Sequence, residues 1–269
     1  YRCTIQIQKK IGNSFIQQIV SLESGSIRLE FDTTVDWQEL HRLLKVSFPV
    51  DVYAEEAINE IQFGYVKRPT HRSRQYDKDR FEVCNHRYTA LSDEGHGAAV
   101  LNDCKYGVSV KGNSINLTLL RAEGSPVLAG DAGVHHFVYA FTAWEGSFLE
   151  SPVVRQGYEL NITPVLVSGK KSSYSFFQIT GVENCILDTV KPAEDGSGDL
   201  ILRLYESKHA DTFATLHWDI SVSAAYLCDM TESQESRQLL ETQENQCRLH
   251  FRPFEVKTVR LKRKDSATA

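Results

Sequence analysis

Hydrophobic and polar residues alternate with a period of two along much of the chain. The alternation is clearest over residues 27–35, 200–204 and 216–226. In the last segment, apolar residues occupy the even positions from Leu216 to Tyr226, and mostly polar ones occupy the odd positions. Successive side chains of a β-strand point to opposite faces, so such a run buries one face of a sheet and leaves the other to solvent. The pattern predicts a β-strand over each segment.

Short turn sequences separate several of the predicted strands. Lys111-Gly-Asn-Ser114 is typical of a tight hairpin between two alternating runs, and residues 194–198 have the same character. Near the end of the chain, the apolar positions change parity at Pro253. Because proline cannot donate to a sheet ladder, we interpret Pro253 as a bulge or an edge position.

Helical signals are weak. Asp36 and Glu39 resemble a capping box, and Trp37, Leu40 and Leu44 have helical spacing, so a helix of one or two turns is one interpretation of this segment. Residues 43–50 fit a strand equally well, and the polar residues 231–246 fit either a short helix or a long loop. The absence of long amphipathic helices excludes α/β barrels and doubly wound sheets. The predicted fold class is all-β.

The polar run at residues 168–173 is the best candidate for a linker. It divides the chain into a larger β-sandwich over residues 1–167 and a smaller one over residues 174–269. A chain of 269 residues has room for one large domain or two smaller ones, which agrees with this division.

Charge and composition narrow the classes of partner. The 30 lysines and arginines are outnumbered by 35 acidic residues, which argues against nucleic acid or an anionic membrane as the main partner. No stretch approaches 18 consecutive apolar residues, so we expect no membrane span. The chain begins at Tyr1 without a leader-like segment, and we expect it to be part of a longer polypeptide.

The six cysteines lack any Cys-x-x-Cys spacing and are too sparse for a disulfide scaffold. Cys185 and Cys228 fall in apolar strand segments, where a free cysteine behaves as a small buried hydrophobe. This cysteine usage favours a reducing, cytoplasmic location.

Residues 67–88 carry the densest polar chemistry of the chain. Arg68, His71, Tyr76 and Asp77 lie in a predicted loop between two strands, and guanidinium groups, carboxylates and an aromatic face suit polyhydroxylated ligands such as sugars. The alternative is a solvated loop whose charges pair with one another.

Other patterns of chemistry are poorly supported. Adjacent His135 and His136, with Asp131 close by in sequence, point to opposite faces of a strand, and His96 stands apart from them between two glycines. These residues give no complete set of metal ligands. No Gly-x-Ser-x-Gly elbow, phosphate-binding loop or His-Glu-x-x-His motif is present. We therefore expect neither a metal site nor a catalytic group in these residues.

A series of ordered motifs resembles the C-terminal half of the family 38 glycoside hydrolases, the α-mannosidases, and among them the cytosolic and bacterial type. The resemblance covers essentially the whole chain. The motifs lie at residues 35–46, 60–64, 68–71, 80–83, 86–88, 101–107, 119–121, 131–139, 175–177, 190–191, 194–196, 202–206 and 251–257.

The resemblance implies a large super-sandwich of the galactose-mutarotase type followed by a smaller C-terminal β-sandwich. It implies that the zinc ion and the aspartate nucleophile of a retaining α-mannosidase belong to an N-terminal catalytic domain outside these residues, so this chain alone is expected to be inactive. The expected partners are α-mannosides, the N-terminal catalytic and helical domains of the same protein, and a second copy in a homo-oligomer. Within this chain, the resemblance marks as substrate-binding candidates Arg68, His71, Tyr76, Asp77 and Arg87.

The segment departs from the family at Ser73, Arg74 and Tyr76, where an Asn-Thr pair and a tryptophan are usual, and at Asn59, where an aromatic residue is usual. These departures put substrate preference in question.

Two other functions remain open on the sequence. One is a carbohydrate-binding module with Tyr76 as its platform. The other is a sugar mutarotase in which His71 or His86 works with Glu82. If other domains are missing from this chain, a contiguous apolar patch should be exposed on a sandwich face.

Overall fold

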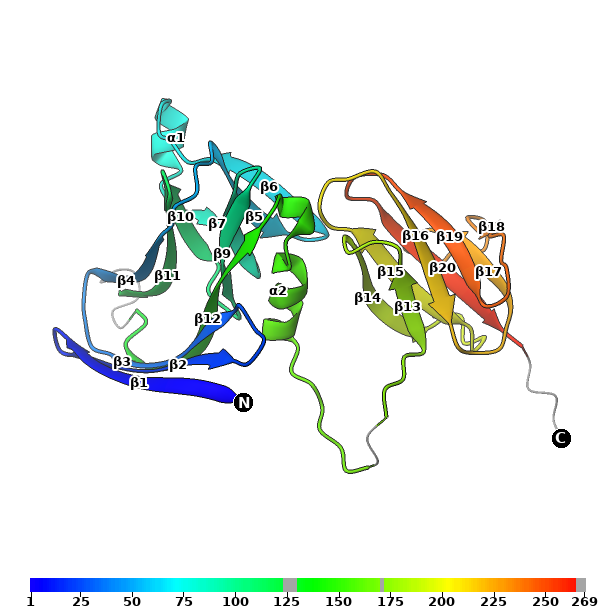
Figure 1. The fold of residues 1–269 in the computed structure, drawn as a ribbon, viewed down its shortest axis with the longest axis horizontal. Coiled ribbons are helices and arrows are strands. Elements are labelled where there is room, and N and C mark those ends of the chain that lie inside the picture. The colour runs from blue at the N-terminus through cyan, green and yellow to red at the C-terminus, as the bar shows by residue number, and fades with distance from the viewer. Residues whose placement is uncertain (123–129, 170–171, 265–269) are drawn as a thin grey trace. The chain divides into compact units, whose positions relative to one another are not determined.

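The computed structural model describes residues 1–122, 130–169 and 172–264, and it is almost entirely β, as the alternation predicts. Two compact units divide the chain (Figure 1). The first comprises Tyr1–Ile61 and Tyr65–Val165, and the second comprises Gln62–Gly64 and Leu166–Ala269. The first unit ends close to the linker expected at residues 168–173, of which 170–171 lie outside the described residues.

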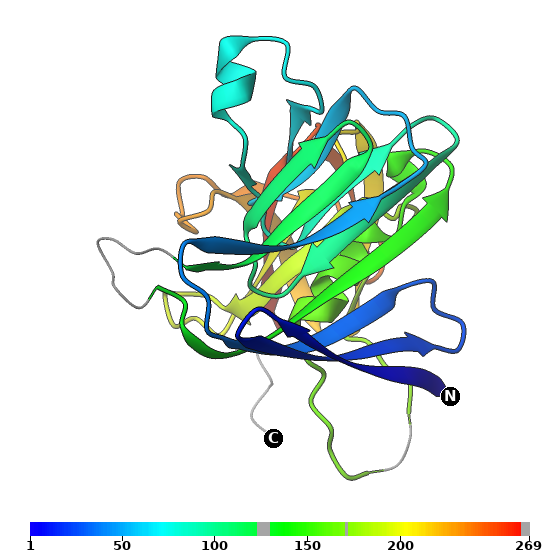
Figure 2. The ribbon, with the colours of Figure 1, turned by 90° about the vertical axis from the view of Figure 1, so that its left-hand side faces the viewer.

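The first unit contains two antiparallel sheets. The larger has the order β1-β2-β3-β12-β9-β8-β5-β6, and the smaller has the order β4-β11-β10-β7 (Figure 2). The strands are β1 (Arg2–Ile11), β2 (Ser14–Glu23), β3 (Leu29–Trp37), β4 (Arg42–Pro49), β5 (Glu56–Ile61), β6 (Gly64–Pro69), β7 (Val83–Cys84), β8 (Tyr88–Ser92), β9 (His96–Asn102), β10 (Gly107–Lys111), β11 (Ser114–Ala122) and β12 (Gly133–Glu145). The helical elements are α1 (Gln75–Asp79), the 3-10 turn Phe148–Glu150 and α2 (Val153–Asn161).

The core of the first unit lies between these two sheets. Val35 and Phe137 of the larger sheet and Ile115 of the smaller one are fully buried in a single hydrophobic cluster. At its margin the rings of Phe31 and Tyr139, which face each other across β3 and β12, stack with centroids 4.9 Å apart. This sandwich fixes the strand ends that carry the polar segment 67–88.

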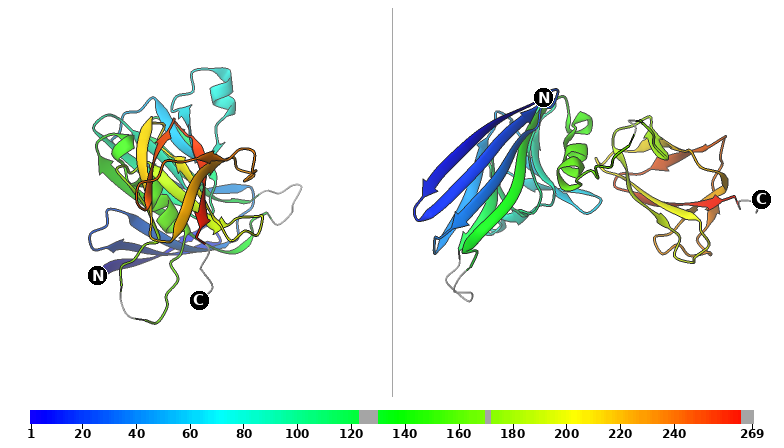
Figure 3. Two further views of the ribbon diagram at one scale, coloured as in Figure 1. Left: turned by 90° about the vertical axis from the view of Figure 1, so that its right-hand side faces the viewer. Right: turned by 90° about the horizontal axis from the view of Figure 1, so that it is seen from below.

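The β1–β2 end of the larger sheet is much less covered than the rest. β1, β2, β3 and β12 lie side by side (Figure 3), and every residue of β1 is exposed. The exposed apolar side chains on β1 and β2 are Ile5, Ile7, Ile11, Phe15, Ile19 and Leu22.

The second unit is a smaller sandwich of a three-stranded sheet, β13-β16-β19, and a five-stranded sheet, β14-β15-β20-β17-β18. Its core joins Leu202 and Val259 of the larger sheet to Leu216 and Phe251 of the smaller one. The strands are β13 (Phe177–Thr180), β14 (Cys185–Pro192), β15 (Leu200–Glu206), β16 (Thr212–Trp218), β17 (Val222–Cys228), β18 (Gln238–Leu239), β19 (Gln246–Phe251) and β20 (Val256–Arg263).

Both predicted turns join antiparallel strands. Lys111 pairs with Ser114 across a two-residue turn, and residues 194–198 connect β14 to β15. The parity change at Pro253 has a different cause from the predicted bulge, because β19 and β20 belong to different sheets and the chain crosses between them there. The polar residues 231–246 form turns and the short β18, and no helix.

The predicted strand over residues 216–226 is not continuous, because β16 ends at Trp218 and β17 begins at Val222 in the other sheet. The chain turns after Trp218, and β17 carries a register shift between Val222 and Ala224. The shift exchanges the two faces, so Ala225 is fully buried although the alternation placed it on the solvent side.

The capping box suggested by Asp36 and Glu39 is not formed. Asp36 lies within β3, and Glu39 is buried, where its carboxylate accepts hydrogen bonds from the backbone N–H of Asn13 at 2.6 Å and the hydroxyl of Ser14 at 3.3 Å. The alternative interpretation of this segment as a strand is correct for residues 42–49. Among the described residues, no helix is long and apolar enough to cross a membrane.

Candidate functional site

The polar segment 67–88 begins at the end of β6 and returns to the smaller sheet at β7. Between them α1 forms a single helical turn, in which the backbone N–H of Arg74 donates to the Asp77 carboxylate at 3.0 Å. Asp77 is the only buried residue of this helix. A carboxylate that accepts a backbone N–H at a helix start stabilises the turn, which gives Asp77 a structural role.

A cavity of about 80 Å³ lies against this segment. Three of the five predicted substrate-binding residues, Arg68, His71 and Asp77, line it together. Asn59, Arg72 and Arg80 also line it. The structure therefore brings together residues from β5, β6 and α1 and from the loops on either side of α1.

Arg68 is the most enclosed of the cavity's arginines. It lies near the end of β6, and its guanidinium donates to the Cys84 carbonyl at 3.1 Å. Burial lowers the pKa of Arg68, and the nearby charge of Arg80 lowers it further. A half-buried guanidinium with one carbonyl partner retains free donors for an acidic or hydroxylated ligand.

His71 is exposed at the rim of the cavity. Its Nδ1 lies 2.9 Å from the hydroxyl of Ser73, one of the positions at which the chain departs from the family pattern. This contact orients the imidazole and leaves Nε2 available to a ligand.

Tyr76 does not line the cavity. Tyr76 is 44% exposed, and the guanidinium groups of Arg74 and Arg80 each lie 5.4 Å from the centroid of its ring. A sugar-binding platform needs a free aromatic face. The guanidinium groups of Arg74 and Arg80 lie against this ring and compete with a sugar for it.

Arg87 belongs to a different structural feature. Its guanidinium forms an ion pair with the buried Glu60 at 2.6 Å and lies 3.7 Å from the centroid of the Tyr158 ring. Burial alone lowers the pKa of Arg87, but hydrogen bonds and the charge of Glu60 outweigh burial and raise it. Arg87 immediately precedes β8, so these contacts connect the start of that strand to β5 and α2. Arg87 does not line the cavity.

Among the cavity residues that the sequence did not mark as candidates are Asn59, Arg72 and Arg80. Arg72 and Arg80 lie in the charged segment 67–88, but nothing in the sequence distinguishes them from the other charged residues there. Asn59 is 1% exposed in β5 and was noticed only as a departure from the family pattern. A polar residue in a buried strand is the signal that could have identified it.

The pair required by the mutarotase hypothesis is not assembled in the described part of the chain. The Glu82 carboxylate accepts from Lys45 at 3.1 Å and from the Thr118 hydroxyl. His71 bonds to Ser73, and His86 packs edge-on to Tyr106 with centroids 5.8 Å apart. No hydrogen bond links Glu82 to either histidine within residues 1–122.

The histidines considered as metal ligands are engaged elsewhere. His135 Nε2 contacts the Asp131 carbonyl at 2.6 Å, His136 Nε2 contacts Asp32 at 2.8 Å, and His96 Nε2 contacts the Asp51 carbonyl at 2.6 Å. Across residues 1–122, 130–169 and 172–264, no three His, Cys, Asp or Glu side chains gather in a group that could hold a metal ion.

Comparison with known families and proteins agrees with this architecture. Residues 1–127 match the family model described as the glycosyl hydrolases family 38 C-terminal domain, and residues 184–259 match the family 38 C-terminal beta sandwich domain. Alpha-mannosidase 2C1 of Homo sapiens is 40% identical over 255 residues, which cover 93% of this chain and 24% of the relative. An alpha-mannosidase of Saccharomyces cerevisiae is 31% identical over 290 residues, covering 97% of this chain and 27% of the relative.

The fold is also found in a solved structure. An alpha-mannosidase from Enterococcus faecalis superposes with a TM-score of 0.75 at 19% identity, covering 93% of this chain and 29% of that one. The chain thus spans about a quarter of the length of the curated relatives cited above. Two family 38 models match successive parts of the chain, and the relatives align over nearly all of it. The chain therefore belongs to the family 38 glycoside hydrolases, of which it represents the C-terminal β region.

Proposed function

We propose that this chain is the non-catalytic C-terminal portion of a retaining α-mannosidase that hydrolyses terminal α-mannosyl residues of oligosaccharides. The observation that carries the proposal is the 40% identity to an α-mannosidase over 93% of the chain. The nucleophilic carboxylate and the zinc ion are assigned to a part of the polypeptide outside residues 1–269. The described residues contain no cluster that could replace that metal site.

The contribution of this chain is a rigid wall for the mannose-binding pocket. Arg68 lies near the end of β6, and His71 lies at the rim of the cavity. Both side chains have N–H groups that can donate hydrogen bonds to sugar hydroxyls. The eight-stranded sheet behind them supplies the rigidity that a binding wall needs. Tyr76 and Arg87 have no part in this wall, because neither lines the cavity.

A cytoplasmic location is part of the proposal. All six cysteines are free, and burial raises the pKa of the Cys185 thiol to about 12 and that of Cys247 to about 11. Thiols of this kind persist in a reducing compartment and are unreactive there.

A free-standing sugar-binding module is the second candidate that the sequence left open. The arginines beside Tyr76 work against it, since they compete with a sugar for the ring face. Calorimetric titration of residues 1–269 with mannose decides between the two functions. Saturable binding of mannose by the isolated chain would support the module and count against the supporting role.

The proposal predicts the effect of His71→Ala in the longer polypeptide that contains this chain. Loss of the imidazole should lower kcat/KM on an aryl α-mannoside about tenfold or more, because a ligand hydrogen bond is lost, and should leave the melting temperature unchanged. His136→Ala is the matched control, as His136 is exposed on β12 and away from the cavity.

Two results would overturn the proposal. One is equal kcat/KM for the His71→Ala and His136→Ala proteins, which would mean that the cavity is not part of the mannose-binding pocket. The other is turnover of the aryl mannoside by residues 1–269 alone, which would place catalytic groups inside this chain.

A further inference from the structure

The cavity beside α1 concentrates positive charge. Its lining includes Lys67, Arg68, Arg72 and Arg80, against a single carboxylate from Asp77. The chain as a whole carries a net charge of −5, so this gathering of cations does not reflect its average composition. Arg68 is half-buried, whereas Lys67, Arg72 and Arg80 are exposed. Like charges gathered around one cavity repel one another and attract an anion.

Most of this charge has no acidic partner. Lys67 lies 3.9 Å from Glu56, at the limit of an ion pair. Within the described parts of the chain, neither Arg68, Arg72 nor Arg80 forms an ion pair, and the first two donate only to carbonyl oxygens, those of Cys84 at 3.1 Å and Phe81 at 3.4 Å. Of the alternative interpretation, a solvated loop whose charges pair with one another, the pairing is absent for these three arginines, while Arg72 and Arg80 are exposed to solvent.

The one acid of the cavity is already engaged. The Asp77 carboxylate accepts the backbone N–H of Arg74 at 3.0 Å, and it makes no ion pair with the cavity's arginines among the described residues. Arg80 instead lies over the ring of Tyr76. Asp77 thus stabilises α1 and leaves the arginine donors free for another acceptor.

One residue that lines the same cavity also has a buried polar atom without a partner. The Asn59 side chain, 1% exposed, donates from Nδ2 to the Thr89 hydroxyl at 3.0 Å, while its Oδ1 has no partner in the described structure. Whichever way the amide is turned, one of its two polar atoms stays unsatisfied. An unpaired buried polar atom is costly, and a ligand group that reaches it recovers that cost.

We propose that this cavity is an oxyanion subsite, in which Arg68, Arg72 and Arg80 bind a phosphate-like group. Guanidinium forks match the oxygen spacing of phosphate and bind it through charge-assisted hydrogen bonds. A cavity of about 80 Å³ has room for a small tetrahedral anion.

The anion has two possible sources, which share this chemistry. It is either free phosphate or the phosphate group of a phosphorylated sugar. The second source rests on the proposed function, because it makes the chain part of an enzyme that accepts negatively charged mannosides. The first source does not depend on mannosidase activity.

The test is calorimetric titration of residues 1–269 with inorganic phosphate, mannose 6-phosphate and mannose. We expect saturable binding of phosphate and a loss of affinity of about tenfold or more in Arg68→Gln and in Arg72→Gln, as expected for removal of a charge-assisted hydrogen bond. Arg42→Gln is the matched control, since Arg42 is an exposed arginine of the same unit that does not line the cavity. Melting curves without phosphate establish that each variant is folded.

The outcomes are distinct. Tighter binding of mannose 6-phosphate than of phosphate assigns the site to a phosphorylated sugar, and equal binding assigns it to the free anion. Absence of saturable phosphate binding, or an equal loss in Arg42→Gln and the two cavity variants, overturns the subsite. The mannosidase assay of the longer polypeptide is a separate measurement, so failure of the subsite and failure of the proposed function can be told apart.

Discussion

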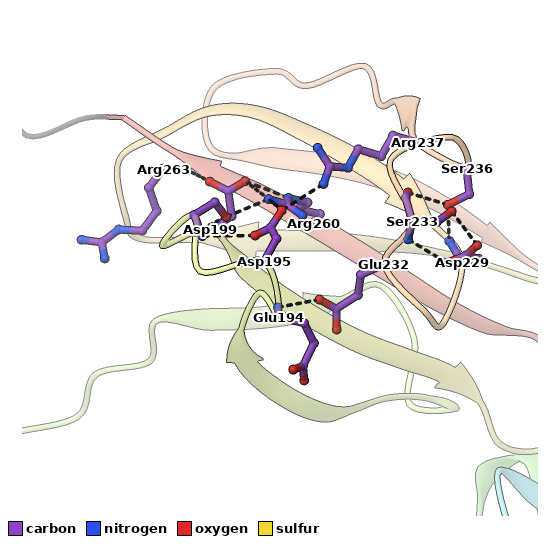
Figure 4. A network of polar contacts seen from close by, with 11 residues as sticks. Glu194, Asp195, Asp199, Asp229, Glu232, Ser233, Ser236, Arg237, Arg260 and Arg263 are labelled. Carbon is purple, nitrogen blue, oxygen red and sulfur yellow. Dashed lines mark hydrogen bonds and ion pairs between the residues drawn. The ribbon is translucent and has the colours of Figure 1, made fainter.

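At the scale of single residues, the second unit contains a buried arginine that is paired with two carboxylates. Arg260 in β20 is 2% exposed, and its guanidinium reaches Asp199 at 2.7 Å, Asp195 at 2.8 Å and the Ser197 hydroxyl at 2.8 Å (Figure 4). Hydrogen bonds from Ser197 and Arg260 hold the pKa of Asp195 well below its usual range. The arrangement fastens the β14–β15 turn to the middle of β20.

Replacing this cation should destabilise the second unit. We expect Arg260→Gln to lower the free energy of unfolding by about 3 kcal/mol, because it leaves the buried Asp199 without its charged partner. Arg263→Gln, an exposed arginine of the same strand, is the control and should change stability little. Urea denaturation, followed by the Trp218 resonance of fluorotryptophan-labelled protein, measures the stability of both variants.

The pH dependence of this difference has a definite sign. A carboxylate with a depressed folded-state pKa stabilises the fold above its ordinary pKa of 3.8, and that stabilisation is lost as the pH falls further. The gap between the wild-type chain and Arg260→Gln should therefore be full at neutral pH and should narrow below about pH 4. A gap that is constant with pH, or a similar loss in Arg263→Gln, would contradict this account.

Residues also mark the limit of what sequence could predict about the site. Arg68, His71 and Asp77 are neighbours in sequence, and proximity along the chain was enough to group them. Arg87 follows soon after them and was grouped with them, but its partner Glu60 lies 27 residues earlier on β5. Its position depends on the pairing of β5 with β8, which sequence spacing does not reveal.

At the scale of elements, alternation and turn chemistry were sufficient for strands that bury one face and expose the other, such as β3 and β16. They failed where a local irregularity changes the face, as at the register shift in β17. Helix α2 was not predicted from the sequence, and its nine residues pack against β8 and β9. A Cβ at Gly157 would lie 3.3 Å from Cβ of Arg87, so glycine permits this helix to approach β8 closely.

The β1–β2 pair is the element with the clearest consequence in solution. β1 ends the eight-stranded sheet, so its ten residues offer an unpaired backbone edge among the described strands. Its register places Ile5 opposite Val20 and, through β2 and β3, on the face that buries Tyr139. On β1 that face is uncovered, with Ile5 63% and Ile7 37% exposed.

We therefore expect residues 1–269 to self-associate with rising concentration through β1. Replacing both Ile5 and Ile7 with serine should weaken the association constant about tenfold or more, since each isoleucine contributes apolar area to the contact. Gln6→Ser combined with Gln8→Ser changes the opposite face of the same strand and should leave association nearly unchanged. Sedimentation velocity measures all three proteins. A monomer at every concentration, or equal weakening in both variants, would argue against an apolar contact on this face.

At the scale of the whole molecule, each unit has a sandwich core of its own. Phe137 is fully buried in the first core and Phe251 in the second. The three tryptophans divide in the same way, with Trp37 and Trp144 in the first unit and Trp218 in the second. Because a domain with its own core unfolds as a cooperative unit, the tryptophans can report on the two units separately.

The two cores should therefore respond independently to substitution. In fluorotryptophan-labelled protein, we expect Phe251→Ala to lower the urea midpoint of the Trp218 resonance and to leave the Trp37 and Trp144 midpoints in place. Phe137→Ala should do the reverse. Each substitution removes a fully buried ring, which costs about 3–5 kcal/mol in the unit that contains it. If all three resonances shifted together in either variant, the chain would unfold as one cooperative body, and the second sandwich would depend on the first for its stability.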